Sequence, residues 1–147
     1  MPEVSLAARA VARRVLLHEA GGHTEPVALA EAAERADARL RGRLGGLIGQ
    51  TGYTILADRA VRLARAEVPT LEGVAVDTGA EGGLRGVRAF ALASDGDAGA
   101  AEAGLSALLA HVIGLLSTFI GEDLALRLVR EAWPELAHGQ DESEGQA

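Results

Sequence analysis

Cysteine and lysine are both absent from this 147-residue sequence, and each absence excludes a class of chemistry. Without cysteine the chain forms no disulfide, has no thiolate nucleophile and offers no cysteine ligand to a metal. Without lysine it cannot form a Schiff base through a side-chain amine, and it has no lysine for a phosphate-binding P-loop. Its 14 basic side chains are therefore all arginine.

Aromatic residues and positive charge are both scarce. Aromatics make up 3% of the chain and β-branched residues are sparse, which disfavours a sheet protein. Abundant alanine and leucine favour helices instead. The formal net charge of −7 disfavours nucleic acid and anionic membrane surfaces as partners, because both bind basic faces. The length fits a single domain.

The longest apolar stretch runs from Ala103 to Gly121 and carries no formally charged residue. At 100° per residue, its bulky side chains occupy one broad side of a helix. These residues are Leu105, Leu108, Leu109, Val112, Ile113, Leu116, Phe119 and Ile120. The opposite side is small or weakly polar, so a second backbone can approach it closely. We therefore predict a central helix that is buried nearly all round.

The same stretch is close to the minimum length of a membrane-spanning helix. However, His111, Ser117 and Thr118 lower its hydropathy, and acidic residues flank it, Glu102 before and Glu122 after. We expect a core helix and no membrane span. The first residues, MPEVSLAARAVARRV, lack the apolar core of a signal peptide, so we expect a cytoplasmic protein.

Capping residues place two helices before the central one. A first helix is expected over Leu6–Ala20 with Ser5 as its N-cap, and Thr24 fits the N-cap of a second. Apolar residues of the second helix recur at spacings of three and four: Leu29, Ala33, Ala36, Leu40, Leu44 and Leu47. Asp37 and Arg41 fit an ion pair at i,i+4 on the same helix.

A third helix is expected from residue 51 or 52 to Val68, where Pro69 ends it. A last helix follows Gly121 and is closed by Trp133, and we interpret the indole as a core anchor. Its inward residues are Leu124, Ala125, Leu128, Val129 and Ala132. The sequence thus predicts an all-α, compact bundle of about five helices around the buried central helix.

The segment Thr70–Ala98 is the hardest to interpret. It favours a loop with a short strand at Val74–Val76, then a helix rather than a strand over Leu84–Leu92. Asp95 and Asp97 are both available to cap the central helix. We expect one helical domain over residues 1–137 and a disordered acidic tail over residues 138–147.

Four glycines cluster where the second predicted helix ends, and they are Gly42, Gly45, Gly46 and Gly49. In a continuous helix they would share one side, opposite the leucine stripe. Each would cost about 1 kcal/mol in a helix interior. The segment is therefore either a hinge between helices or a face packed closely against another backbone.

No catalytic constellation stands out. The glycine cluster lacks the pattern of a P-loop and the glycine spacing of a dinucleotide-binding turn. His111 has no carboxylate or second histidine at i±3 or i±4, so a buried histidine bonded to a carbonyl or hydroxyl is expected rather than a metal ligand. His18, Glu19, His23 and Glu25 cluster in sequence, but Gly21 and Gly22 leave their spacing loose. We predict no enzyme activity, cofactor or metal.

The leading hypothesis is a non-catalytic protein-interaction or assembly module, regulatory and self-associating. The glycine side of the second helix would need a neighbour, and a homodimer with Gly42, Gly45, Gly46 and Gly49 at its interface supplies one. The alternative is a small-molecule sensor with an apolar pocket beside the central helix. The candidate pocket residues are His111, Gly114 and Thr118. An enzyme that uses His111 is the least favoured class.

Overall fold

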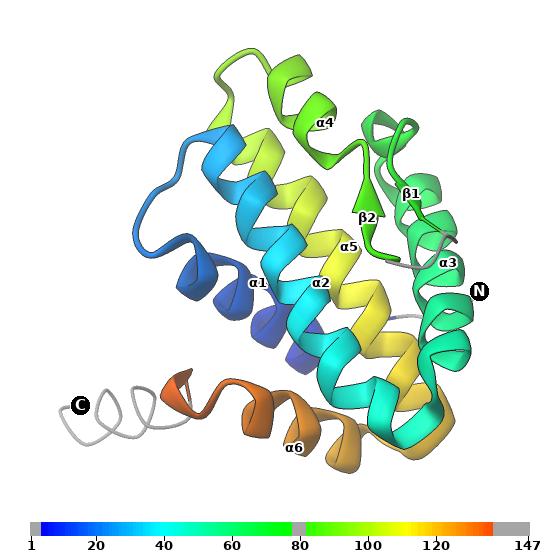
Figure 1. The fold of residues 1–147 in the computed structure, drawn as a ribbon. Helices are drawn as coiled ribbons and strands as arrows, with labels where there is room; N and C mark the ends of the chain where they lie inside the picture. The colour runs from blue at the N-terminus through cyan, green and yellow to red at the C-terminus, as the bar shows by residue number, and fades with distance from the viewer. Residues whose placement is uncertain (1–3, 78–81, 137–147) are drawn as a thin grey trace, which may run out of the picture.

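The computed structural model describes residues 4–77 and 82–136. Six α-helices, one 3₁₀ turn and a two-stranded antiparallel ladder follow one another in these residues (Figure 1). In chain order they are α1 (Leu6–Ala20), α2 (Pro26–Ile48), α3 (Gln50–Glu67), η1 (Pro69–Leu71), β1 (Ala75–Val76), β2 (Leu84–Arg85), α4 (Val87–Ala93), α5 (Ala98–Ile120) and α6 (Glu122–Ala132).

Helix α5 lies at the centre and packs against α1, α2, α3 and α6, which confirms the all-α bundle around a buried helix. It begins at Ala98 rather than Ala103, because Asp97 caps it by accepting a 3.0 Å hydrogen bond from the Ala100 N–H. Among the described residues it is the one helix long and apolar enough to cross a membrane, and most of that apolar stretch is buried inside the bundle.

The start of α1 follows the sequence prediction, but the start of α2 does not. Ser5 caps α1 by accepting a 3.0 Å hydrogen bond from the Ala8 N–H. The predicted cap at Thr24 is wrong, because α2 begins at Pro26 and Glu25 occupies the N-cap without a side-chain hydrogen bond. Proline is suited to this first helical position, since its missing N–H has no partner there in any case.

The glycine-rich segment is helical, so the hinge interpretation of Gly42, Gly45 and Gly46 is wrong. Helix α2 continues through Ile48, and the break comes at Gly49 with φ 84° and ψ 156°. This positive φ strongly favours glycine, because in any other residue the Cβ atom would clash with the residue's own backbone.

The segment between α3 and α5 contains both strand and helix. Ala75 pairs with Arg85 and Val76 with Leu84, which confirms the short first strand. Residues 84 and 85 form the second strand, so the predicted helix over this segment begins only at Val87. The predicted tail, residues 138–147, lies outside the described residues.

The second half of the chain repeats the architecture of the first. Helices α2 and α5 are both 23 residues long, and both end in an isoleucine followed by a glycine with positive φ. Gly121 has φ 91° and ψ 147°, close to the values at Gly49. Each glycine N–H bonds to a carbonyl four residues back, at Gly45 and Ser117. The two junctions therefore have the same backbone geometry.

The helices after these junctions also correspond. Residues 57–71 read ADRAVRLARAEVPTL and residues 122–136 read EDLALRLVREAWPEL, with Asp, Ala, Arg, Leu, Arg, Pro and Leu in register. Val68 and Trp133 end the two helices with similar angles, φ −125° and −129°. Helix α3 has 18 residues and α6 has 11, a difference of seven, or two helical turns.

The two long helices, one from each half, lie parallel to each other in the bundle. Figure 1 shows α2 (cyan) and α5 (yellow) side by side and running in the same direction. The short helix α1 packs on both long helices, whereas α4 packs mainly on α2, so the contacts of the two halves differ. Helix α2 contacts helices of both halves but keeps an exposed face, whereas α5 is buried along most of its length.

Candidate functional site

An apolar groove opens at the end of the bundle where the two isoleucine–glycine junctions meet. Its volume is about 330 Å³. Its walls come from the end of α2, the first half of α3 and the end of α5. The lining residues are Ile48, Gly52, Ile55, Leu56, Arg59, Leu116, Phe119 and Ile120.

Large apolar side chains are exposed around this groove. Phe119 is 70% exposed and Ile55 is 66% exposed, and both line it. Leu47, beside Ile48 in sequence, is 58% exposed, and Leu124, four residues after Ile120, is 40% exposed. We call this surface the apolar end and define it by Leu47, Ile48, Ile55, Phe119, Ile120 and Leu124.

Three of these residues correct the sequence prediction. Leu47, Phe119 and Leu124 were expected to face the core because they follow the apolar periodicity of their helices. They lie close to the two junction glycines, where α2 and α5 end and α6 begins. Helical periodicity gives the direction of a side chain around its axis, but not whether a neighbouring helix extends far enough to cover it.

Arg59 is the one charged residue that lines the groove. In the part of the chain that the structure describes, its guanidinium has no hydrogen-bond or ion-pair partner, whereas Arg62 on the same helix pairs with Asp58 at 3.1 Å. The groove therefore combines an apolar wall with one available positive charge.

The predicted glycine interface lies beside this end. Gly42 and Gly46 are exposed and have open space where a Cβ atom would stand, and Gly49 is exposed at the junction. Gly45 differs, because the Gln50 side chain covers it. The described chain leaves three of these four glycines accessible, and their role as an interface stays a prediction.

The predicted pocket residues lie on the other side of α5 from the groove. Gly114 is half-buried under Val4, whose Cγ2 would lie 3.2 Å from an added Cβ. Thr118 is exposed, and its hydroxyl donates to the Gly114 carbonyl at 3.1 Å. His111 is buried and bonds to a residue of α3. None of the three lines the groove, which instead uses Leu116, Phe119 and Ile120 of the same helix.

His111 belongs to a charged cluster that joins three helices. Its Nε2 donates to Glu67 Oε1 at 2.9 Å, and Arg9 contacts both carboxylate oxygens, at 2.8 and 3.0 Å. The expected carbonyl or hydroxyl partner is therefore wrong, since the partner is a carboxylate distant in sequence. The hydrogen bonds from Arg9, aided by His111 and opposed by partial burial, lower the pKa of Glu67 to about 2. Such a carboxylate is a weak base, so the cluster favours a structural role.

Asp37 forms a second polar cluster, and it is buried rather than exposed. The Tyr53 hydroxyl donates to Asp37 Oδ1 at 2.8 Å, and Arg41 Nη2 lies 3.6 Å from Oδ2. Burial raises the pKa of Asp37, while Tyr53 and Arg41 oppose that rise. Because Asp37 and Tyr53 are both almost fully buried, a substrate would not reach them.

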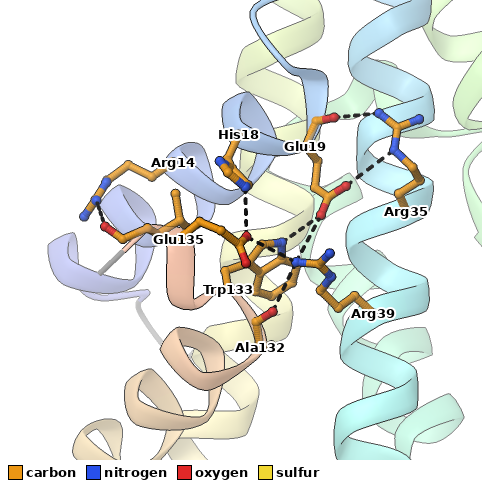
Figure 2. Close-up of polar contacts among 9 residues, drawn as sticks. Arg14, His18, Glu19, Arg35, Arg39, Ala132, Trp133 and Glu135 are labelled. Carbon is orange, nitrogen blue, oxygen red and sulfur yellow. Dashed lines mark hydrogen bonds and ion pairs between the residues drawn. The ribbon is translucent and has the colours of Figure 1, made fainter. Parts of the chain in front are cut away.

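A third cluster fastens the end of α6 to α1 and α2 (Figure 2). The Trp133 indole is fully buried, as predicted, and its Nε1 donates to Glu19 Oε2 at 2.8 Å. The Arg39 guanidinium lies 5.3 Å from the centroid of the indole and donates to the Ala132 carbonyl. Arg35 donates to the Glu19 carbonyl at 2.6 Å. These polar groups bond to one another, which is typical of a cluster that holds helices together.

Within residues 4–77 and 82–136, no group of three or more histidine, aspartate or glutamate side chains is arranged to hold a metal ion. No protein-family model, no curated protein and no solved structure matches this chain.

Proposed function

We propose that the chain is a non-catalytic assembly module that pairs with a second copy of itself through the apolar end. One observation carries the proposal: Phe119 and Ile55 are large, exposed and adjacent to a groove of about 330 Å³. Contiguous exposed apolar surface on a folded domain is typical of an interaction site.

The surface is suited to a second copy because it supplies both halves of a contact. Phe119 lines the groove and is largely exposed, so its ring is available to contact a second copy. A symmetric pair places each projecting side chain against the groove of the other copy, so one patch serves both partners. The net charge of −7 would oppose self-association elsewhere, but the groove itself carries no acidic residue.

Sedimentation velocity over a range of concentrations tests this function. We expect a monomer–dimer equilibrium for the unsubstituted chain and a dissociation constant at least about tenfold weaker for Phe119→Asp, because a buried aromatic contact becomes a charge. Leu92→Asp is the matched control: Leu92 is 64% exposed on α4, outside the apolar end. A chain that stays monomeric at high concentration would refute the proposal.

The second candidate is a small-molecule sensor, and the groove volume favours it. A volume of about 330 Å³ lies at the lower end of the range for small-molecule pockets, roughly 300–1,000 Å³. A thermal-shift screen with apolar compounds separates the two functions. A compound that stabilises a monomer, and whose effect Ile55→Asp removes, would support the sensor.

A further inference from the structure

The groove follows one face of α3 and reaches a charged side chain. Four of its lining residues recur along this helix at spacings of three and four, and they are Gly52, Ile55, Leu56 and Arg59. Such spacing places them on the same side of the helix. From Gly52 to Arg59 the helix makes about two turns, roughly 10 Å at about 1.5 Å per residue. The α3 wall of the groove is therefore an elongated apolar surface with a guanidinium at its far end.

Arg59 differs from the other arginines of α3 in having no partner. Arg62 pairs with Asp58 at 3.1 Å, and Arg65 donates to two backbone carbonyls between α3 and β1. The Arg59 guanidinium has no hydrogen bond or ion pair with any residue in the described ranges 4–77 and 82–136. A guanidinium binds a carboxylate through two parallel hydrogen bonds. Arg59 is therefore free to hold an anionic group beside the apolar wall.

Charge also sets the direction in which an apolar anion would lie. None of the eight described residues that line the groove is acidic. Glu122 and Asp123 follow Ile120, a lining residue, by two and three positions at the junction where α6 begins. These carboxylates repel an anion, whereas Arg59 attracts one. Charge complementarity therefore places the anionic group at Arg59 and the apolar chain toward the junctions.

We propose that the groove binds a medium-chain fatty acid, with its carboxylate on Arg59 and its alkyl chain against Ile55, Leu56 and Phe119. The volume of about 330 Å³ suits a single short chain, because it lies at the lower end of the range for small-molecule sites, roughly 300–1,000 Å³. The α3 wall is similar in length to extended octanoate. This inference rests on the sensor function, the second candidate above, and names its ligand class.

Binding of the acid has a consequence for assembly. Ile55 and Phe119 line the groove and also belong to the surface proposed to contact a second copy. A bound acid covers both side chains, so the acid and the second copy exclude each other. Octanoate should therefore shift a monomer–dimer equilibrium toward the monomer, because it binds only the monomer.

Isothermal titration calorimetry with octanoate and octanol tests the head group, since the two probes share one alkyl chain. Arg59→Gln should weaken octanoate binding about fivefold, the upper end of what an exposed ion pair contributes, and leave octanol binding unchanged. Arg62→Gln is the matched control, because it neutralises a paired arginine of the same helix outside the groove. It should change neither affinity.

The alkyl chain is tested by filling the groove. An added Cβ at Gly52 would lie 3.5 Å from the Ile48 side chain, an ordinary contact. Gly52→Leu should therefore fold and weaken both probes at least about tenfold, by occupying their place. Gly42→Leu makes the same change on α2 at an open position outside the groove, and it should have no effect. Replacing hexanoate by octanoate should tighten binding by up to about fourfold per methylene, which corresponds to about 0.8 kcal/mol.

The possible failures are distinguishable. If Arg59→Gln weakens both probes equally, or if octanol binds and octanoate does not, the carboxylate assignment is wrong and the sensor function stands without it. If neither probe binds, the fatty acid is wrong, and the thermal-shift screen decides the sensor function. Flotation with phosphatidylglycerol vesicles, without octanoate binding, would assign the surface to a bilayer instead. Sedimentation velocity without ligand decides self-association independently of all these results.

Discussion

Replacing Trp133 with alanine removes the largest fully buried side chain of the described bundle. Burial of an aromatic side chain removes roughly 150–250 Å² from water. At about 25 cal/mol per Å² this amounts to about 4–6 kcal/mol, and measured aromatic-to-alanine changes in cores cost about 3–5 kcal/mol. The substitution also removes the Nε1 donor from Glu19 Oε2. We expect a loss of about 3–5 kcal/mol in the free energy of unfolding.

Urea unfolding followed by circular dichroism at the helical minimum is the suitable assay, because Trp133 is the only tryptophan and fluorescence would lose its reporter. Phe119→Ala is the matched control, since it also truncates an aromatic side chain but one that is 70% exposed. Its effect should stay within about 0.5 kcal/mol. Both variants are compared at one low protein concentration, because self-association would add to apparent stability.

Equal urea midpoints and slopes for Trp133→Ala and Phe119→Ala would contradict the role of Trp133 as a core anchor. That result would mean that the contacts in Figure 2 do not stabilise the packing of the end of α6 on the bundle.

Two further predictions concern acid stability and glycine. The lowered pKa of Glu67, about 2, means that its contribution to stability is present above its ordinary pKa of 4.5 and is lost as the pH falls toward 2. Glu67→Gln should therefore make the melting temperature depend less on pH in that window. The corresponding loss in the free energy of unfolding is about 1 kcal/mol or less, because the pair is partly exposed. A pH profile like that of the unsubstituted chain would contradict the assignment. Gly42→Ala should raise the unfolding free energy by up to about 1 kcal/mol, since Gly42 is helical with open space beside it. Gly86→Ala should lower it, because Gly86 has φ +79° and an added Cβ would overlap the Gly73 carbonyl; equal effects of these two substitutions would contradict the backbone geometry.

The sequence allowed the fold class and several helix ends to be predicted because these depend on local chemistry. Ser5 and Asp97 cap their helices through hydrogen bonds within three residues. Trp133 follows a strongly amphipathic helix, and its large apolar ring predicted the burial that is found. Such features need only the neighbouring residues.

Long-range partners could not be predicted in the same way. Glu67 and His111 are 44 positions apart, so a search for partners along one helix did not reach the carboxylate. Asp37 and Arg41 form the i,i+4 pair that their spacing predicted, but the hydrogen bond from Tyr53 on α3 was not predicted. Helical spacing describes contacts within one helix and not those with the helices that pack on it.

The internal repeat left a signal in the sequence that the helix-by-helix interpretation missed. An isoleucine–glycine pair, then an arginine-rich helix, then a proline and a leucine occur in both halves. Two helical turns are missing from α6, which changes the spacing between the matching residues and hides the repeat from a search at constant period. The apolar end was missed for a related reason, since it forms only where the two junctions meet in space.

Hydrogen exchange at low and high protein concentration tests the self-association at the apolar end most directly. The first backbone amides of a helix have no intrahelical acceptor, so those at 50–52 and 122–124 should exchange fast in the monomer. Assembly through the apolar end predicts that both segments become slower at high concentration, while α4 is unchanged. Exchange that is the same at both concentrations, or slowing confined to α4, would contradict it.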